Sequence, residues 1–376
     1  MGGNALEANT ARASSRHYLN VFAQVQRRLQ SEWPEVATYL PRKHRQKENH
    51  GDLDLLVRRD TANLSRKWIN STFDNRDLYV NDGVWTFDMP LPTSAFDNRF
   101  QVDLVTKRPE HWEMSKAYLD QSGFGNICGK LARWLRYKLG FQGLRMPVYK
   151  DPEGERSVKY GEYVLTRDPQ RAFEFLELDY EGFQEGFSSM KEIFDYIAKS
   201  KYFCEQPFLP ENMNAGQRHR DRKRPVWSQF KEYLSGLKQN GNLPSKPKSR
   251  PTQEEAIQKA KEAFLESEIH HRLEGDKETF RLREKARETW TGEVPMNEFG
   301  IEGEKLGEML QAFQNTFNSD RHRFEWVVRN SLEEALERFK WANRDHFDEV
   351  DQSLAQGDEY SRQSLLQNQN LREGNS

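Results

Sequence analysis

Cysteine is scarce in this sequence, which contains only Cys128 and Cys204 among its 376 residues. The two cysteines show no pairing pattern, and so small a number argues against a zinc site. Scarce cysteine is typical of proteins that work in a reducing compartment. We therefore expect a cytoplasmic or nuclear protein.

Long hydrophobic runs and an excess of one charge are also missing. No apolar stretch approaches the length of a transmembrane helix, and no signal-peptide core is present, so we expect neither a membrane partner nor secretion. The formal net charge is −2, which excludes a global basic field. A nucleic-acid partner would therefore have to be held by local basic patches. No pattern indicates an oligomeric state.

What the chain does contain is a helix-forming, charged composition with 35% apolar and 31% charged residues. These proportions are typical of a protein with a modest core and a heavily charged, helix-rich surface. The length allows two or three domains.

The most informative stretch carries two aspartates in an alternating strand pattern, Gly51-Asp52-Leu53-Asp54-Leu55-Leu56-Val57. Alternate side chains of a strand share a face, so Asp52 and Asp54 point one way while Leu53, Leu55 and Val57 point into a core. A second apolar strand carries one aspartate, in Phe100-Gln101-Val102-Asp103-Leu104-Val105. If the two strands pair, three carboxylates converge on one spot.

Three clustered carboxylates repel one another and raise one another's pKa unless a divalent cation binds between them. Carboxylate oxygens suit Mg²⁺, which also takes substrate phosphates as ligands. The chemistry that this pattern predicts is phosphoryl or nucleotidyl transfer on two metal ions. The alternative interpretation is a solvated strand face, or a sheet edge protected by charge.

The pattern Gly-Asp-x-Asp, followed by a hairpin and one further strand aspartate, resembles the nucleotidyltransferases of the DNA polymerase beta superfamily. That superfamily includes family X polymerases, poly(A) polymerases and CCA-adding enzymes, and the resemblance covers residues 40–110. It implies that Asp52 and Asp54 bind Mg²⁺ (or Mn²⁺). It also implies that Asp103, the third metal-binding carboxylate, helps to activate the attacking hydroxyl, and that an NTP such as ATP is the substrate.

The activity implied by the resemblance is transfer of a nucleoside monophosphate from an NTP to a hydroxyl, with pyrophosphate leaving. We expect the hydroxyl to be a nucleic-acid 3′ end, of RNA or DNA, while a protein or small-molecule acceptor stays open. Two alternatives remain. A metal-dependent nuclease would use the same three carboxylates, and a catalytically inactive member would serve as a nucleic-acid-binding module.

The sequence departs from this family in its phosphate-binding residues. Members usually carry a Gly-Ser or Gly-Gly pair about ten residues before the aspartates, but residues 39–50 contain no such pair. One candidate replacement is Gly2-Gly3, because backbone amides in a glycine turn can approach phosphate closely. Gly51 and Lys130 are further nucleotide-binding candidates. The other replacement is a basic run of Arg42, Lys43, Arg45 and Lys47.

The segment from Gly123 to Lys130 imitates a phosphate-binding loop. It fails as a Walker A loop, because Phe124 occupies the first glycine position and Leu131 the Ser/Thr position. We interpret it as a turn that opens a helix whose apolar face consists of Leu131, Trp134, Leu135 and Leu139. Within the resemblance, Lys130 on this helix is placed to touch the triphosphate.

The densest positive run lies at residues 218–224 and precedes three aromatic residues, Trp227, Phe230 and Tyr233. Five arginines and lysines in seven residues can contact several phosphates, and nearby aromatic rings can stack on bases. The nucleic-acid-binding candidates are Arg218, Arg220, Arg222, Lys223 and Arg224. The alternative is a solvated turn before an amphipathic helix whose aromatic residues belong to the core.

The resemblance implies an α+β fold, in which a small mixed nucleotidyltransferase sheet with flanking helices is followed by helical domains. We expect a catalytic core at 1–110, a helix-rich extension at 111–235, a linker at 236–251, a helical C-terminal domain at 252–350 and a disordered tail at 351–376. Spacing predicts strands at 52–57, 84–89 and 99–106 and helices at 14–31, 170–180, 252–287, 303–318 and 320–345.

Overall fold

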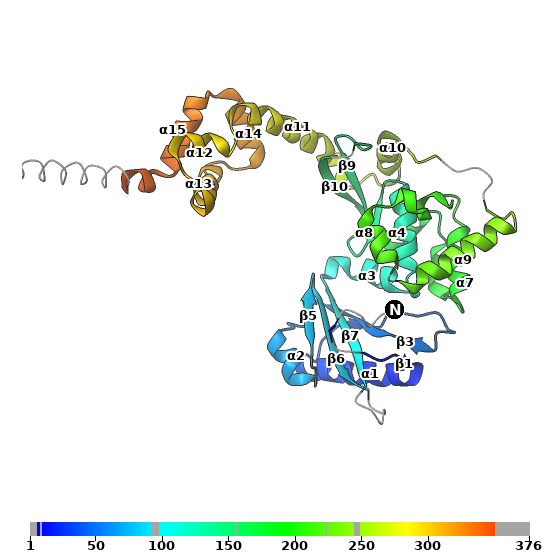
Figure 1. Cartoon of the computed structure of the whole chain (residues 1–376). Coiled ribbons are helices and arrows are strands. Elements are labelled where there is room, and N and C mark those ends of the chain that lie inside the picture. The colour runs from blue at the N-terminus through cyan, green and yellow to red at the C-terminus, as the bar shows by residue number, and fades with distance from the viewer. Residues whose placement is uncertain are drawn as a thin grey trace, which may run out of the picture. The chain divides into compact units, whose positions relative to one another are not determined.

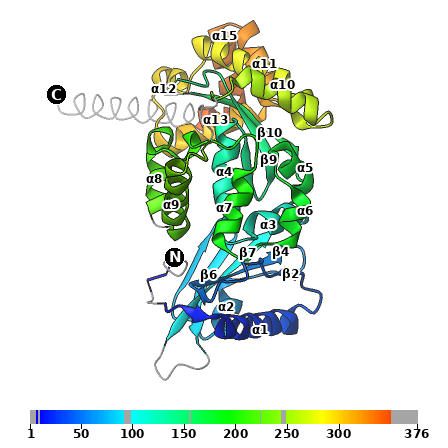
Figure 2. The ribbon, with the colours of Figure 1, turned by 90° about the vertical axis from the view of Figure 1, so that its right-hand side faces the viewer.

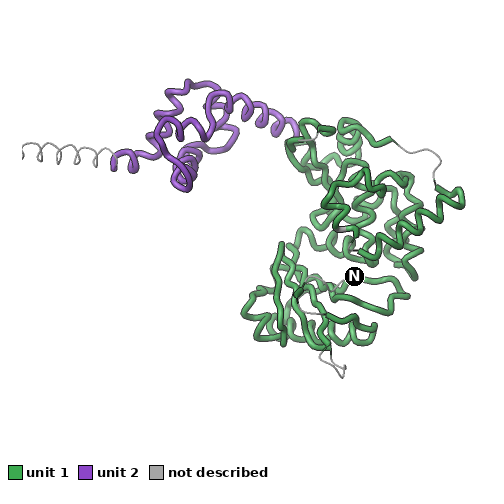
Figure 3. Tube along the Cα trace, viewed as in Figure 1, with its two compact units in different colours: residues 1–271 green, residues 272–376 purple. Residues whose placement is uncertain are grey.

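The computed structural model describes residues 6–7, 10–91, 98–154, 157–222, 224–243 and 249–349. The chain forms two compact units, unit 1 (Met1–His271) and unit 2 (Arg272–Ser376), which are drawn in different colours in Figure 3. The tail predicted at 351–376 lies outside the described residues. Unit 1 contains every strand described below.

Unit 1 is built around a five-stranded mixed sheet with helices on both faces, so the predicted α+β class is confirmed (Figure 1). The strand order is β2-β4-β7-β6-β5; β4 and β7 run parallel, and the other neighbours are antiparallel. The strands are β2 (Thr38–Tyr39), β4 (Asp52–Arg58), β5 (Leu78–Asn81), β6 (Val84–Pro90) and β7 (Arg99–Lys107). The strands predicted at 52–57, 84–89 and 99–106 are therefore confirmed.

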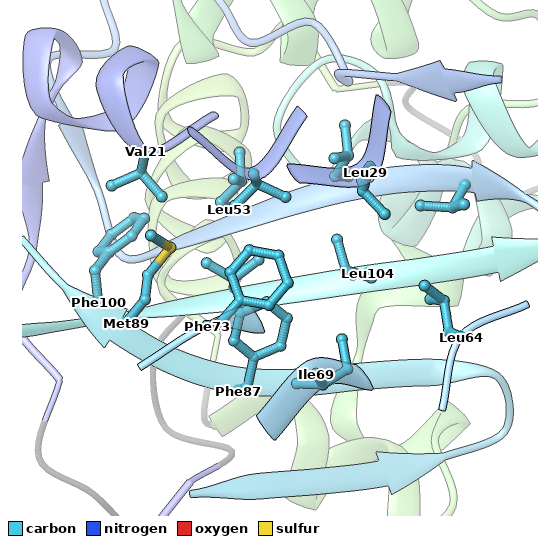
Figure 4. Packing of buried hydrophobic residues seen from close by; sticks show 14 of the residues in the cluster. Val21, Leu29, Leu53, Leu64, Ile69, Phe73, Phe87, Met89, Phe100 and Leu104 are labelled. Atoms are coloured by element: carbon cyan, nitrogen blue, oxygen red, sulfur yellow. The ribbon is translucent and has the colours of Figure 1, made fainter. Parts of the chain in front are cut away.

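One face of this sheet carries the main hydrophobic core. Leu53, Leu55 and Val57 of β4 are fully buried there, together with Val102 and Leu104 of β7. Figure 4 shows how the sheet residues point into the same cluster as Val21 and Leu29 of α1 (Ser15–Glu32) and Ile69 of α2 (Arg66–Thr72). Because strand side chains alternate, burying this face directs the aspartates of β4 and β7 to the opposite face.

Helix α1 follows directly from its sequence. Ser14 caps it by accepting a hydrogen bond from the backbone N–H of His17, and Tyr18, Val21, Val25 and Leu29 form its buried stripe. This stripe has the helical spacing that predicted a helix at 14–31. Figure 2 shows α1 lying along one side of the sheet, with the helical layer of unit 1 on the other side.

That helical layer and two smaller sheets complete unit 1. A three-stranded antiparallel sheet consists of β8 (Lys138–Gly140), β9 (Gly143–Tyr149) and β10 (Lys159–Thr166), and β1 (Ala13–Ser14) pairs with β3 (Asn49–His50). The helices are α3 (Trp112–Leu119), α4 (Phe124–Trp134), α5 (Pro169–Phe175), α6 (Tyr180–Glu185), α7 (Met190–Ala198), α8 (Ala215–Arg222), α9 (Pro225–Gln239) and α10 (Gln253–Ala263). Short 3-10 helices lie at η1 (Pro109–His111), η2 (Gln206–Phe208) and η3 (Pro210–Asn212).

The turn predicted before α4 is confirmed. Gly123 adopts a left-handed conformation with φ of 99° and precedes the helix, a conformation that favours glycine. A Cβ on Gly125 would lie only 2.3 Å from the backbone oxygen of Tyr118, so this glycine permits α4 to pack closely against α3. The helix is shorter than predicted, because the chain turns at Arg136 (φ 73°) and Leu139 belongs to β8 instead.

Three other predicted helices are interrupted. The helix predicted at 170–180 ends after Phe175, since Glu177 adopts a left-handed conformation with φ of 55°. The capping box of Thr252 and Glu255 is confirmed, but its helix, α10, ends at Ala263. Buried Phe264 turns inward there and packs against the ring of Phe175 at 4.9 Å. The third interruption lies in unit 2.

Unit 2 is helical, and its elements are α12 (Glu293–Phe299), α13 (Gly303–Asn315), α14 (Asp320–Arg329), α15 (Leu332–Ala342) and most of α11 (Glu268–Thr289). Its core is a cluster of Met309, Phe313, Phe317 and Phe339. The helix predicted at 320–345 divides at Asn330, because Ser331 and Glu334 form a second capping box that starts α15.

Replacing Ser331 by alanine is expected to destabilise unit 2 by about 1 kcal/mol, because an N-cap hydroxyl that satisfies an exposed backbone N–H is lost. Urea unfolding followed by tryptophan fluorescence measures the change. Glu337→Ala is the matched control, since this exposed residue lies inside the same helix and caps nothing. Equal midpoints for the two variants would contradict the role of the capping box.

The two compact units divide after His271 rather than within the linker predicted at 236–251. Helix α10 belongs to unit 1 because it is bonded there: the hydroxyl of Tyr137 donates to the backbone oxygen of Ala256 at 2.8 Å. Gln253 and Tyr149 exchange two hydrogen bonds of 2.8 Å. These contacts join residues more than a hundred positions apart, so local composition did not reveal them.

Candidate active site

Three carboxylates meet on the face of the central sheet opposite the hydrophobic core. Strands β4 and β7 are in parallel register with Asp54 beside Asp103, and Asp52 lies two residues earlier on the same face of β4. One oxygen from each of Asp52, Asp54 and Asp103 lies within 4.8 Å of the other two. The convergence predicted from the alternating pattern is therefore present.

Burial and mutual repulsion raise the pKa of two of these carboxyl groups toward neutral pH. Burial raises the pKa of Asp52 to about 6, and the charge of Asp54 adds to the rise while Lys43 opposes it. Burial also raises the pKa of Asp103 to about 7, with further increases from Asp54 and Asp52. An uncompensated cluster of this kind favours a cation.

Hydrogen bonds from its own strand and from β6 orient Asp103. The side-chain nitrogen of Gln101 lies 3.0 Å from each carboxylate oxygen of Asp103, and Thr86 of β6 donates to the same carboxylate. These bonds favour the charged form and so oppose the rise in the pKa of Asp103. Gln101 and Thr86 were not singled out in the sequence, although each shares the strand face of Asp103.

Residues 42–47, which we call the basic loop, precede β3 and supply the cations nearest to the three aspartates. The Nζ atom of Lys43 lies 3.2 Å from Oδ2 of Asp54, and this lysine side chain is 12% exposed. Burial lowers the pKa of Lys43, but Asp54, Tyr18 and Asp52 more than offset that effect and raise it above its ordinary value. Burial and the charge of Lys43 lower the pKa of Lys47 to about 8, against the attraction of Asp52 and Asp54.

The two arginines of this loop contact the helical layer instead of the aspartates. The guanidinium of Arg42 donates to Asp120 at 2.7 Å and to the backbone oxygen of Gln184 at 2.6 Å. Arg45 donates to Ser188 Oγ at 3.1 Å and to the backbone oxygen of Glu185 at 3.0 Å. Arg42 was predicted to bind the nucleotide; it instead anchors the loop to the helical layer, and Lys43 contacts the aspartates.

A stacked pair of rings adjoins the loop. The ring of Tyr18 stacks on that of His50 at 4.0 Å, and His50 Nε2 lies 3.3 Å from Ser15 Oγ. Burial raises the pKa of Tyr18 to about 12, and Lys43 opposes this while Asp54 and Asp52 add to it. Among the residues that the structure describes, the buried Tyr18 hydroxyl has no hydrogen-bond partner. The helical spacing that predicted a helix at 14–31 includes Tyr18 as an apolar residue, and no sequence pattern gave His50 a role.

His50 itself is held neutral. Burial lowers its pKa to about 4, and the nearby charges of Lys47, Lys43 and Arg12 lower it further. Its position directly before Gly51 is the sequence signal that could have singled out His50. Gly51 is buried between β3 and β4, and Ala13 of β1 pairs with His50.

The N-terminal glycines, Gly2 and Gly3, lie outside the described residues. The described segment that follows them borders the site. Thr10 forms a bridge with Arg99, and the backbone N–H of Ala11 donates to the oxygen of Arg99 at 2.7 Å. Residues 10–14 thus run beside the starts of β4 and β7.

Lys130 was predicted to touch the triphosphate, but its ammonium is engaged elsewhere in unit 1. It forms an ion pair with Asp221, lies 2.9 Å from the sulfur of Met213 and sits 3.8 Å from the ring centre of Trp227. These contacts tie α4 to α8 and α9. We therefore assign Lys130 a packing role.

The basic run at 218–224 is divided among several partners. Arg218 donates to the backbone oxygen of Met213, Asp221 pairs with Lys130, and Arg224 donates to the side chain of Asn126. Arg222 is exposed, whereas the side chain of Arg220 and the whole of Lys223 lie outside the described residues. The aromatic residues Trp227 and Phe230 are buried, which confirms the core interpretation for both.

The donor set fits a divalent cation. Its three oxygen ligands come from adjacent strands of a rigid sheet, and carboxylate oxygens are the ligands that Mg²⁺ and Mn²⁺ accept. The charge of Lys43 lowers the pKa of Asp52 but does not offset burial and the charge of Asp54, which raise it. Asp52, Asp54 and Asp103 would hold the ion.

No helix in the described part of the chain has both the length and the apolar character needed to cross a membrane. The sequence matches none of the protein-family models with which it was compared, and no curated protein matches it significantly.

Proposed function

We propose that this protein is a metal-dependent nucleotidyltransferase that moves a nucleoside monophosphate from an NTP to a hydroxyl. The observation that carries the proposal is the convergence of Asp52, Asp54 and Asp103 on one face of two parallel strands, with Lys43 beside them. Three carboxylates without a bound cation form an unfavourable arrangement, so their assembly calls for a function.

Each residue has a defined role in this proposal. Asp52, Asp54 and Asp103 would hold Mg²⁺ or Mn²⁺, which when bound would neutralise charge on the phosphoryl oxygens and acidify the attacking hydroxyl. Asp103, held by Gln101 and Thr86, accepts the hydroxyl proton at a carboxylate oxygen. A bond then forms between the hydroxyl oxygen and the α-phosphorus, the bond from that phosphorus to the bridging oxygen breaks, and pyrophosphate leaves.

The triphosphate brings several negative charges next to the aspartates and needs cations of its own. Lys43 and Lys47 lie in the stretch where the superfamily carries its glycine pair, and both interact electrostatically with Asp52 and Asp54. Lysine binds phosphate as a point charge. The hydroxyl of Tyr18, which has no hydrogen-bond partner in the described part of the chain, adds a hydrogen-bond donor beside them.

Incubation of the protein with each labelled NTP, Mg²⁺ and a mixture of RNA and DNA oligonucleotides tests the proposal. Extension of an oligonucleotide is the expected result. Shortening would indicate a metal-dependent nuclease that uses the same carboxylates. Neither extension nor shortening, with any NTP and acceptor, would favour a catalytically inactive binding protein.

Replacing Lys47 by glutamine is expected to raise the KM for the NTP about tenfold with little change in kcat, because a phosphate contact that forms on binding is lost. Steady-state kinetics measure the effect, and Arg27→Gln, an exposed change on α1, is the control. Gly3→Val is the competing variant: if it raises the KM sharply while Lys47→Gln does not, the N-terminal glycines hold the triphosphate instead.

A further inference from the structure

Two adjoining hollows open beside the central sheet of unit 1, with volumes of about 620 Å³ and about 260 Å³. Tyr118, Leu139 and Arg145 line both, so the two hollows share a wall. We call the two together the basic groove. Its walls include Arg59, Lys107, Arg108, Lys138, Arg145 and Arg224.

Positive charge is concentrated in the basic groove although the chain as a whole has a net charge of −2. Eight lysines and arginines line it, against two aspartates, Asp82 and Asp221. Glu162 balances part of this charge, since it pairs with Lys138 at 2.5 Å and with Arg145. The remaining excess of cations makes the groove a site for a polyanion.

The larger hollow begins on the same sheet face as the three aspartates. Lys107 follows Asp103 by four residues on β7, so both side chains share a face at a separation of about 13 Å along the strand. The backbone N–H of Arg59 donates to the oxygen of Lys107 at 2.7 Å. Both cations therefore sit at the carboxyl ends of the parallel strands β4 and β7, a common location for ligands.

These cations are available to a ligand. Within the described part of the chain, Arg59 and Lys107 form no ion pair. The ammonium of Lys107 lies 4.2 Å from the ring centre of Phe141, and burial lowers its pKa against the attraction of Asp82. A phosphate bound beside Lys107 would stabilise the charged form of this lysine, which burial disfavours.

Aromatic rings accompany the charges along the groove. Phe141 and Tyr118, both half-buried, line the larger hollow. Unpaired bases can stack on such rings while their phosphates contact the cations, a combination typical of single-strand binding. A duplex would use only the charges, because its bases are already stacked.

We propose that the basic groove binds single-stranded nucleic acid and carries the acceptor strand toward Asp103. The identification of this strand as the acceptor rests on the proposed function, whereas strand binding itself does not.

The test is a binding titration in EDTA without NTP, so that no transfer occurs. Fluorescence anisotropy of a labelled 20-nucleotide RNA of mixed sequence, measured from 50 to 200 mM KCl, gives the Kd and its salt dependence. Replacing Arg59 and Lys107 together by glutamine is expected to weaken binding about tenfold. Because each phosphate contact on a single strand contributes about 0.7 to the slope of log K against log salt, the slope should fall by about 1.4.

The matched control replaces Arg27 and Lys67 by glutamine, which removes the same charge from α1 and α2 on the other face of the sheet. Arg108→Gln, a change at a side chain that is 64% exposed, is a second groove variant and should lower the slope by about 0.7. A groove variant that keeps the parent's Kd and slope would overturn the proposal, as would an equal loss in the control. A duplex that binds as tightly as the single strand would overturn the single-strand assignment.

The same measurements separate this inference from the proposed function. If the parent protein transfers nucleotides while both groove variants bind RNA normally, the groove proposal fails alone. If the groove variants lose binding as expected but the parent transfers no nucleotide, the proposed function fails alone.

Discussion

The Asp54→Asn protein is expected to lose at least about a thousandfold in nucleotide transfer while retaining its fold. Asparagine keeps the shape of the side chain but removes the charge that a divalent cation requires. It also removes the ion pair that Asp54 makes with Lys43 at 3.2 Å. Asp52→Asn and Asp103→Asn should act similarly, because all three carboxylates converge on one position.

Initial rates of oligonucleotide extension measure this loss, and circular dichroism confirms that each variant is folded. Asp60→Asn is the matched control, since Asp60 follows the same strand but pairs at the surface with Arg58. Full activity in all three aspartate variants would show that the cluster is only a charged strand face and has no catalytic role. Loss of activity in the control as well would point to a general effect of removing charge.

The metal-free protein is expected to become less stable as the pH rises from 5 to 8, and Asp103→Asn should relieve much of this loss. The pKa of Asp103 is raised to about 7 and that of Asp52 to about 6, both above the unfolded value of about 3.9. A carboxyl group with a raised folded-state pKa contributes its full stability below pH 4, and loses it as the pH rises through the folded value.

Thermal unfolding in EDTA at several pH values measures this effect. At pH 8 the Asp103→Asn protein should be more stable than the parent by on the order of 2 kcal/mol, a figure reduced from the full pKa shift for solvent screening. At pH 4 the two should be nearly equal. Added Mg²⁺ should stabilise the parent more than the variant. If the stabilities of the two proteins changed with pH in parallel, the charge of Asp103 would not be the source of the repulsion among the carboxylates.

The strands and the aspartate cluster were predictable because their signals are local. The alternation of Asp52 and Asp54 with buried Leu53 and Leu55 fixes the two faces of β4 within a few residues. The same alternating pattern around Asp103 predicted the partner strand, β7. The parallel direction of the pairing between β4 and β7 was not predicted, because either direction would bury the apolar faces of both strands.

The basic residues were harder to assign because their partners are distant in the sequence. Arg42 and Lys43 are adjacent and chemically similar, yet Arg42 binds Gln184 and Lys43 binds Asp54. Likewise Lys130 is neutralised by Asp221, ninety-one residues later. Helix lengths were overestimated for a related reason, since burial of Phe264 ends a helix that its own sequence would continue.

The anchoring of the basic loop has a consequence for how unit 1 responds to substrate. Residues 42–47 belong to the sheet by connectivity, yet Arg42 and Arg45 bond them to residues 184–188 of the helical layer. The lysines that face the aspartates are therefore positioned by both layers at once. Any displacement between the layers moves Lys43 relative to Asp54, so the energy of that displacement and the affinity for a triphosphate are thermodynamically linked, each altering the other by the same amount.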